Sequence, residues 1–227
     1  MRNSIIAVAT LITFTVGFAQ NKNVEEIKIE KQVLNDSRRN GDAMVTTTSL
    51  YRLIALEGEN STYKDSLAYI YFAARKYAPC FMVASDVLKR DPKHIDMLEM
   101  KAISLESLGA LDKSLETNQE LFKLTNNNFN GYTVAKLEYS LKKNTEAFAT
   151  IQKTEKLNDT GTYKVTFNIN QQHTQQVELL AAIAYLKGLI ATELDKKDIA
   201  KESYEKALKI QPDFVLAKDN LENLQKN

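Results

Sequence analysis

The side chains best suited to metal binding are few and widely spaced in this sequence. The only two histidines are His94 and His173, and neither is followed three or four positions later by a second ligand-type residue, as in a helical zinc site. Asp91 precedes His94 by three positions, but one carboxylate across a proline turn does not make a site. We therefore predict no metal and no cofactor.

Residues for covalent or acid–base catalysis are present but do not form a recognisable set. Serines occur without a Gly-x-Ser-x-Gly frame, and the seven glycines lack the spacing of a phosphate-binding loop. Neighbouring acids such as Glu193 and Asp195 are typical of solvated helix faces. We predict that the protein is not an enzyme. A less favoured alternative is the regulatory domain of an enzyme, with chemistry near His173 or Glu178.

The first twenty residues have the three parts of an export signal. Arg2 supplies the positive charge, residues 4–18 form an uncharged apolar run, and Gly17 and Ala19 place small residues before the expected cleavage point. We predict a signal peptide of residues 1–19 or 1–20 and a periplasmic or secreted mature chain. An uncleaved N-terminal membrane anchor is the alternative, because the run approaches the roughly 18 residues that span a bilayer.

The composition of the rest of the chain favours helices and excludes two classes of partner. The chain has 30 basic and 29 acidic residues, and removal of Arg2 with the signal leaves 29 of each. This balance predicts binding neither to nucleic acid nor, after signal cleavage, to a membrane. Three prolines and seven glycines are too few for a protein built of many short strands and turns.

A period of about 34 residues becomes visible when Pro92 and Pro212 are aligned as the ends of two units. Small residues then recur at the eighth and twentieth positions, where two antiparallel helices must approach closely. The eighth position holds Ala68, Ala102 and Gly188, and the twentieth holds Cys80, Ser114 and Ala200. We therefore predict that Cys80 is a small buried residue and not a nucleophile. Gly41 and Gly109 fall where the two helices of a unit are joined, and glycine tolerates the positive φ that ends a helix.

This pattern resembles the tetratricopeptide repeat (TPR) family. The resemblance implies an all-α, TPR-type helical-hairpin solenoid over residues 21–227, and the ending Phe-Ala-Gln of the signal resembles export signals of the Bacteroidetes. The units are expected at about 27–60, 61–94, 95–128, 129–157 and 181–214, with a capping helix at 214–225. The match is weaker in the first unit, where Thr46 replaces the small residue. In the fourth, Ala147 fits only after a one-residue slip and Lys136 occupies the crossing position.

One segment, residues 158–176, interrupts the helical pattern. Tyr163, Val165, Phe167 and Ile169 alternate with polar residues, and this period of two indicates a strand. We predict a small β-hairpin insertion near 160–177, whose apolar face must lie on the helices or on a partner, because an isolated hairpin is marginal in water. A packing role for this insertion is favoured over a functional one.

Function is expected on the concave wall made by the first helix of each unit, where stacked helix pairs bind peptides or proteins. The predicted peptide-binding residues are Tyr69, Phe72, Glu99, Ile103, Glu106, Thr133, Leu137, Ser140, Tyr185 and Leu189. The sequence therefore predicts a protein–protein interaction scaffold or adaptor in the cell envelope. The alternative is a structural protein that self-associates weakly through the hairpin insertion. Some TPR proteins hold a C-terminal carboxylate, but Asp65, Tyr69 and Met100 replace the lysine and asparagines of that motif.

Overall fold

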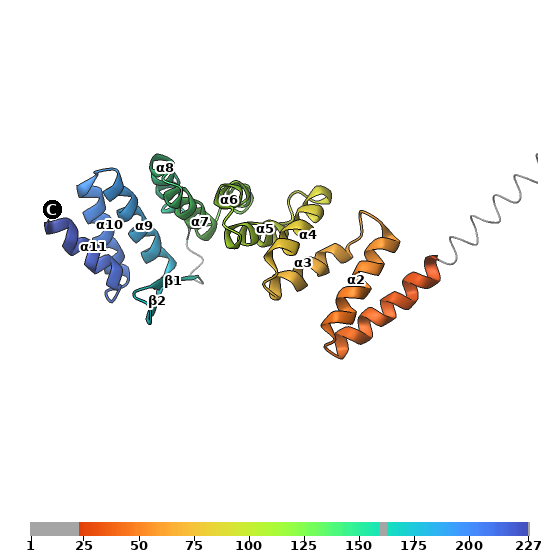
Figure 1. The fold of residues 1–227 in the computed structure, drawn as a ribbon. Coiled ribbons are helices and arrows are strands. Elements are labelled where there is room, and N and C mark those ends of the chain that lie inside the picture. Colours follow the sequence, from red (N-terminus) through yellow and green to blue (C-terminus); the bar gives the residue numbers. More distant parts are fainter. Residues whose placement is uncertain (1–22, 159–162, 227) are drawn as a thin grey trace, which may run out of the picture. The chain divides into compact units, whose positions relative to one another are not determined.

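The computed structural model of the chain describes residues 23–158 and 163–226, so the predicted signal lies outside the described residues. About three quarters of the described residues are helical (Figure 1). A helix over residues 23–39 is followed by α2 (Ala43–Glu57), α3 (Tyr63–Ala73), α4 (Tyr77–Arg90), α5 (Ile95–Ser107), α6 (Leu111–Thr125), α7 (Asn128–Ser140), α8 (Asn144–Thr154), α9 (Leu179–Glu193), α10 (Lys197–Ile210) and α11 (Val215–Lys226). The described residues form two compact units that divide within α5, between residues 100 and 101. From here on, the first unit and the second unit are these two parts, and each repeat is called a pair of helices.

The same left-handed turn joins the two helices of each pair. Its central residue has a φ between 53° and 77° and is, in chain order, Gly41, Arg75, Gly109, Lys142 and Asp195. In each turn the next amide donates to a carbonyl five residues back, as Asp42 N does to Ser37 O at 2.9 Å. This is the Schellman arrangement, which satisfies carbonyls at a helix end. The intervals of 34, 34 and 33 residues, followed by one of 53, locate the extra segment between the last two turns.

Within a pair, small residues allow the helices to touch. In the first unit the Cys80 thiol lies 3.6 Å from the Ala68 carbonyl oxygen, and in the second unit the Ser114 hydroxyl donates to the Ala102 carbonyl at 3.0 Å. Because the same two repeat positions meet in both pairs, the side chain at the twentieth position hydrogen-bonds the backbone of the first helix. Cys80 is fully buried, as the sequence predicted.

The one-residue slip expected at Ala147 of the fourth pair begins earlier in the chain, in α7. Lys136 was expected where α7 crosses α8, but Ala135 and Ala147 are the fully buried small residues there. Lys136 points away from the core and forms an ion pair with Glu106, with 2.9 Å between Nζ and Oε1. The preceding interval of 33 residues explains the shift, because one missing residue rotates α7 by about 100° relative to the expected pattern.

The predicted β-hairpin is confirmed. β1 (Lys164–Asn168) and β2 (Thr174–Glu178) pair antiparallel, with Val165 opposite Val177 and Phe167 opposite Gln175. Val177 is fully buried, while Val165 and Phe167 pack on the helical core of the second unit. The alternation therefore places one face of the β1–β2 hairpin, which we call the ribbon, on the helices and the other face in solvent.

α9 lies at the centre of that core. Its sequence is apolar on every side, and ten of its fifteen residues are buried, which requires neighbours all round the helix. These neighbours are α7, α8, α10 and the ribbon. A side-chain amide also connects the ribbon to the loop after α10: Glu178 N donates to Gln211 Oε1 at 3.0 Å, and Gln211 Nε2 donates to the Gln176 carbonyl at 3.2 Å.

Length and hydropathy together decide whether a helix can cross a membrane. Within residues 23–158 and 163–226, no helix has both the length and the apolar character needed to cross a bilayer.

Candidate functional site

A groove with a volume of about 530 Å³ lies between α7, α9 and β1 in the second unit. α7 contributes Phe129, Tyr132, Thr133, Lys136 and Tyr139, which share one helix face because they are three or four residues apart. α9 contributes Tyr185, Leu186 and Leu189, and β1 contributes all five of its residues. We call this feature the α7–α9 groove.

Aromatic rings form much of the wall of the α7–α9 groove. Phe167 from β1 meets Tyr185 edge-to-face with centroids 5.5 Å apart, and also contacts Phe214 at 5.1 Å. Beside the groove, Tyr163 stacks on Phe129 at 4.5 Å, although Tyr163 remains 44% exposed. These contacts fix the position of β1 against the helices, so the groove is held open by packed rings.

The polar groups of the groove lining are three phenols, two lysines, two threonines and one asparagine. Burial raises the pKa of Tyr185 to about 12, and its hydroxyl accepts a hydrogen bond from Asn220 Nδ2 at 3.0 Å. Burial also raises the pKa of Tyr132 and Tyr139. These phenols therefore stay protonated at physiological pH, and the groove can offer hydrogen bonds and apolar area. It does not offer a pair of groups that exchange protons near neutrality.

Three of the predicted binding residues, Thr133, Tyr185 and Leu189, line the α7–α9 groove. Thr133 and Leu189 are half-buried, whereas Tyr185 is only 5% exposed and is mainly a core residue. Leu137 is 1% exposed and packs with Leu115, Phe122 and Val134. Leu137 therefore has no surface to offer a partner, and we do not keep it in the candidate site.

Three more predicted residues of the second unit lie outside the groove lining. Ser140 is exposed at the end of α7, where its hydroxyl donates to the Lys136 carbonyl at 2.8 Å. Ile103 is 44% exposed on α5. Glu106, also on α5, reaches the groove indirectly through its ion pair with Lys136.

The remaining predicted residues, Tyr69, Phe72 and Glu99, belong to the first unit. Tyr69 is 42% exposed and lines a separate hollow of about 420 Å³ with Arg38, Thr46, Ser66 and others. Its hydroxyl donates to the Asp96 carboxylate, and this bond is the main cause that raises the pKa of Tyr69 to about 12.

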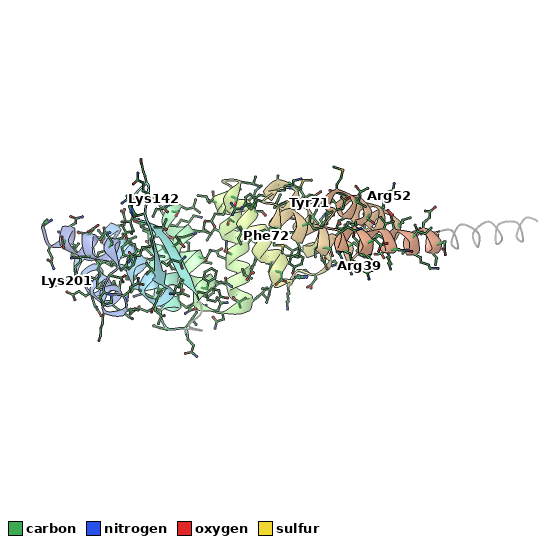
Figure 2. All side chains as sticks on the ribbon, turned by 90° about the horizontal axis from the view of Figure 1, so that it is seen from below. Arg39, Arg52, Tyr71, Phe72, Lys142 and Lys201 are labelled. Atoms are coloured by element: carbon green, nitrogen blue, oxygen red, sulfur yellow. The ribbon has the colours of Figure 1, made fainter. Side chains whose placement is uncertain are left out.

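The acids near Tyr69 affect one another. Desolvation, and to a lesser extent the charge of Asp96, raise the pKa of Glu99 and so favour its neutral form. Phe72, labelled in Figure 2, is half-buried on α3 and packs against the core formed by Ala68, Cys80 and their neighbours.

Several groove residues were not predicted from the sequence: Phe129, Tyr132, Lys136, Tyr139 and the whole of β1. The α7 residues were missed because the one-residue slip places a different face of that helix toward the groove. The alternating pattern of residues 163–169 indicated a strand on the helices, but nothing in it indicated which helices. The spacing of Phe129, Tyr132 and Tyr139 was a detectable signal once the slip was applied to α7.

The two histidines lie apart from the groove lining. His94 is in the turn before α5, and His173 is in the ribbon turn, where its Nδ1 is 3.1 Å from Asn170 Oδ1. Among the residues that the structure describes, no three His, Cys, Asp or Glu side chains are grouped closely enough to hold a metal ion.

Solved structures of similar shape are repeat proteins of low sequence identity. The chain matches YrrB, described as a TPR protein with an unusual peptide-binding site, with a TM-score of 0.63 at 18% identity, over 91% of this chain and 96% of YrrB. It matches a MamA crystal structure with a TM-score of 0.61 at 18% identity, over 74% of this chain and 82% of MamA. MamA from Desulfovibrio magneticus RS-1 gives 0.58 at 13% identity, over 83% and 97% of the two chains.

Similarity to known proteins is much weaker in sequence than in fold. No family model matches this sequence, and no curated protein sequence matches it. The predicted fold class, a TPR-type array of helical hairpins with a small β-hairpin insertion, is confirmed by the structural likeness.

Proposed function

We propose that this chain, which has the tetratricopeptide-repeat fold, is a protein-interaction scaffold that holds a peptide segment of its partner in the α7–α9 groove. The observation that carries the proposal is the groove itself, an open hollow of about 530 Å³ lined by aromatic and aliphatic side chains. Hollows of this size and lining are typical of ligand sites. The peptide-binding site described for YrrB supports the choice of a peptide as the ligand.

The chemistry of the groove favours binding over catalysis. Its phenols remain protonated near neutral pH, and its lining as described contains two lysines and no carboxylate. Such a surface desolvates apolar side chains and donates hydrogen bonds, which is sufficient to hold a peptide. A proton-transfer mechanism would need a group that titrates close to the working pH.

The cellular location proposed for this scaffold is the cell envelope, in the periplasm or after secretion. Support comes only from the predicted signal of residues 1–20, which lies outside the described residues. An uncleaved anchor would leave the same repeat domain attached to a membrane. Cell fractionation of the native protein distinguishes these locations.

Affinity capture from the native envelope fraction tests the proposed function. Thr133→Arg and Leu189→Asp place charges in the groove, and both should abolish capture of the partner. Gln152→Arg, at an exposed position on α8, is the matched control and should leave capture unchanged. Tyr69→Ala tests the separate hollow of the first unit. Capture that persists in both groove variants, with the fold intact by circular dichroism, would contradict the proposal.

A self-assembling structural protein is the second candidate, and it is favoured by the outer edge of β1, which has no strand partner among the described residues. In that case size-exclusion chromatography with light scattering should find an oligomer. Deletion of residues 160–175 should convert the oligomer to a monomer. A monomer in the intact chain would argue against self-assembly.

A further inference from the structure

We infer that the α7–α9 groove binds its partner as an extended strand that pairs with the outer edge of β1; this inference rests on the proposed function. The direction of the backbone groups follows from the ribbon's hydrogen bonds. Leu179 N donates to Tyr163 O at 3.2 Å, and Ile169 N donates to His173 O at 2.9 Å, so odd-numbered residues of this segment face β2. The N–H and C=O groups of Lys164, Thr166 and Asn168 therefore point to the opposite edge.

The two edges of the ribbon differ in their partners. On β2, Gln211 bonds both the Glu178 amide and the Gln176 carbonyl, as a neighbouring strand would. The Gln175 side chain adds two bonds, one to the Asp213 carbonyl in the loop before α11 and one from the amide of Val215, the first residue of α11. No backbone partner of the outer edge of β1 is found among the described residues. Among the described residues, the β2 edge is therefore partly occupied by Gln211, and the β1 edge is the more accessible of the two to another chain.

This edge opens into the α7–α9 groove. Side chains alternate between the two faces of a strand, so a hollow on one face would touch every second residue. The groove touches all five residues of β1, from Lys164 to Asn168, and therefore adjoins its edge. A segment of about five residues beside β1 would form backbone hydrogen bonds on one side and contact Phe129 and Leu189 on the other.

The charges of the lining indicate the chemistry of the partner. Lys136 and Lys164 line the groove, with Glu106 as the ion partner of Lys136, and the lining as described has no carboxylate. An extended peptide that alternates acidic and apolar residues would match this arrangement, because its apolar side chains would lie on the rings and its acidic ones on the solvent face beside Lys164. A second copy of this chain fits less well, because α7 lies across the groove from the β1 edge and a copy would bring its own helices with its strand.

A displayed library of random nine-residue peptides is the probe for this inference. We expect selected peptides to alternate acidic and apolar residues and to lose binding in Leu189→Asp. Thr166→Pro removes an outward N–H, a position where an edge strand tolerates proline, and should weaken binding about tenfold. Thr166→Ala retains the N–H and is the matched control, with no loss expected.

A second experiment uses the natural protein sequence and changes the peptide instead. N-methylation of the selected peptide at one set of alternate residues should weaken binding about tenfold, because those amides would face β1. Methylation at the intervening residues should have little effect. A helical or irregular ligand would not show this period of two.

The outcomes separate the inference from the proposed function. Peptides that depend on Leu189 but bind Thr166→Pro normally, without alternation on methylation, would overturn strand pairing and leave the groove proposal standing. A library that yields no Leu189-dependent peptide would overturn both. Dimers of the intact chain that dissociate in Thr166→Pro would show that a second copy takes the edge, and would also overturn the inference.

Discussion

Replacing Gly188 with alanine tests how closely α9 and α10 pack. A Cβ added at Gly188 would lie 2.6 Å from Cδ1 of Tyr204, and Cε1 and Cζ of the same ring would be no farther than 3.0 Å from it. Optimal carbon–carbon contacts are about 3.5–4.0 Å, so the methyl group would overlap the ring by about 1 Å. One of the two helices, or the ring, has to move.

The ring has little freedom to move. Tyr204 is 1% exposed, its centroid lies 5.9 Å from that of Tyr185, and its hydroxyl is 3.1 Å from the Thr192 hydroxyl. Overpacking of such a core costs about 1–3 kcal/mol. Alanine recovers up to about 1 kcal/mol through its higher helix propensity. We therefore expect Gly188→Ala to reduce the free energy of unfolding by up to about 2 kcal/mol.

Urea unfolding followed by circular dichroism measures this loss, and a double-mutant cycle assigns its cause. Tyr204→Leu removes the ring and should itself cost a few kcal/mol. In that background Gly188→Ala should be neutral or stabilising by up to about 1 kcal/mol, since only helix propensity remains. If Gly188→Ala stabilises the natural sequence, or costs the same with and without the ring, the close approach of these helices is refuted.

Three further predictions concern the turns, the ribbon and a buried acid. Gly109→Ala should lower the free energy of unfolding by about 1 kcal/mol, because φ is 77° there and open space around the residue leaves backbone strain as the only cost. Lys142→Gly at the equivalent turn should raise the free energy of unfolding by up to about 1 kcal/mol. Urea unfolding midpoints measure both changes. Gln211→Ala should lower the free energy of unfolding by about 1–3 kcal/mol and speed hydrogen exchange of the Glu178 amide. An unchanged exchange rate would mean that Gln211 does not hold β2. Burial raises the pKa of Glu138, so the folded state binds its proton more readily than the unfolded state, and this contribution to stability grows as pH falls from 7 toward the ordinary value of 4.5. Glu138→Gln should flatten that rise in thermal unfolding scans against pH; an unchanged pH profile would assign the rise to other groups.

The fold could be predicted from the sequence where residue type alone determines the geometry. Small residues at Ala68, Cys80 and Ala200 are required by helix contact, and they are fully buried. The left-handed turns were detectable only where glycine occupies them. Arg75 and Asp195 adopt the same φ, because the hydrogen bonds of the turn compensate for the cost of a side chain there.

The candidate site could be predicted only in part, since it depends on distances between elements. The helix face of Leu189 follows from the repeat register, whereas Thr133 lines the groove although the register assumed for α7 was shifted by one residue. The burial of Leu137 follows from that shift, which the sequence showed only at Ala147 in the next helix. The position of β1 against α7 and α9 depends on the contacts of Phe167 with Tyr185 and Phe214, which are distant in sequence.

The amide link between Gln211 and the ribbon has a consequence for how this end of the chain opens. Repeat arrays usually fray from their termini, because each hairpin contacts only the next one. Here Gln211, in the loop before α11, is hydrogen-bonded to β2, which precedes α9 in the chain. The terminal helices therefore cannot unfold without also breaking the hydrogen bonds that hold the strand pair. We expect the segment from β1 to α11 to exchange its slowest amides together, as one cooperative block, when native-state hydrogen exchange is followed at low denaturant.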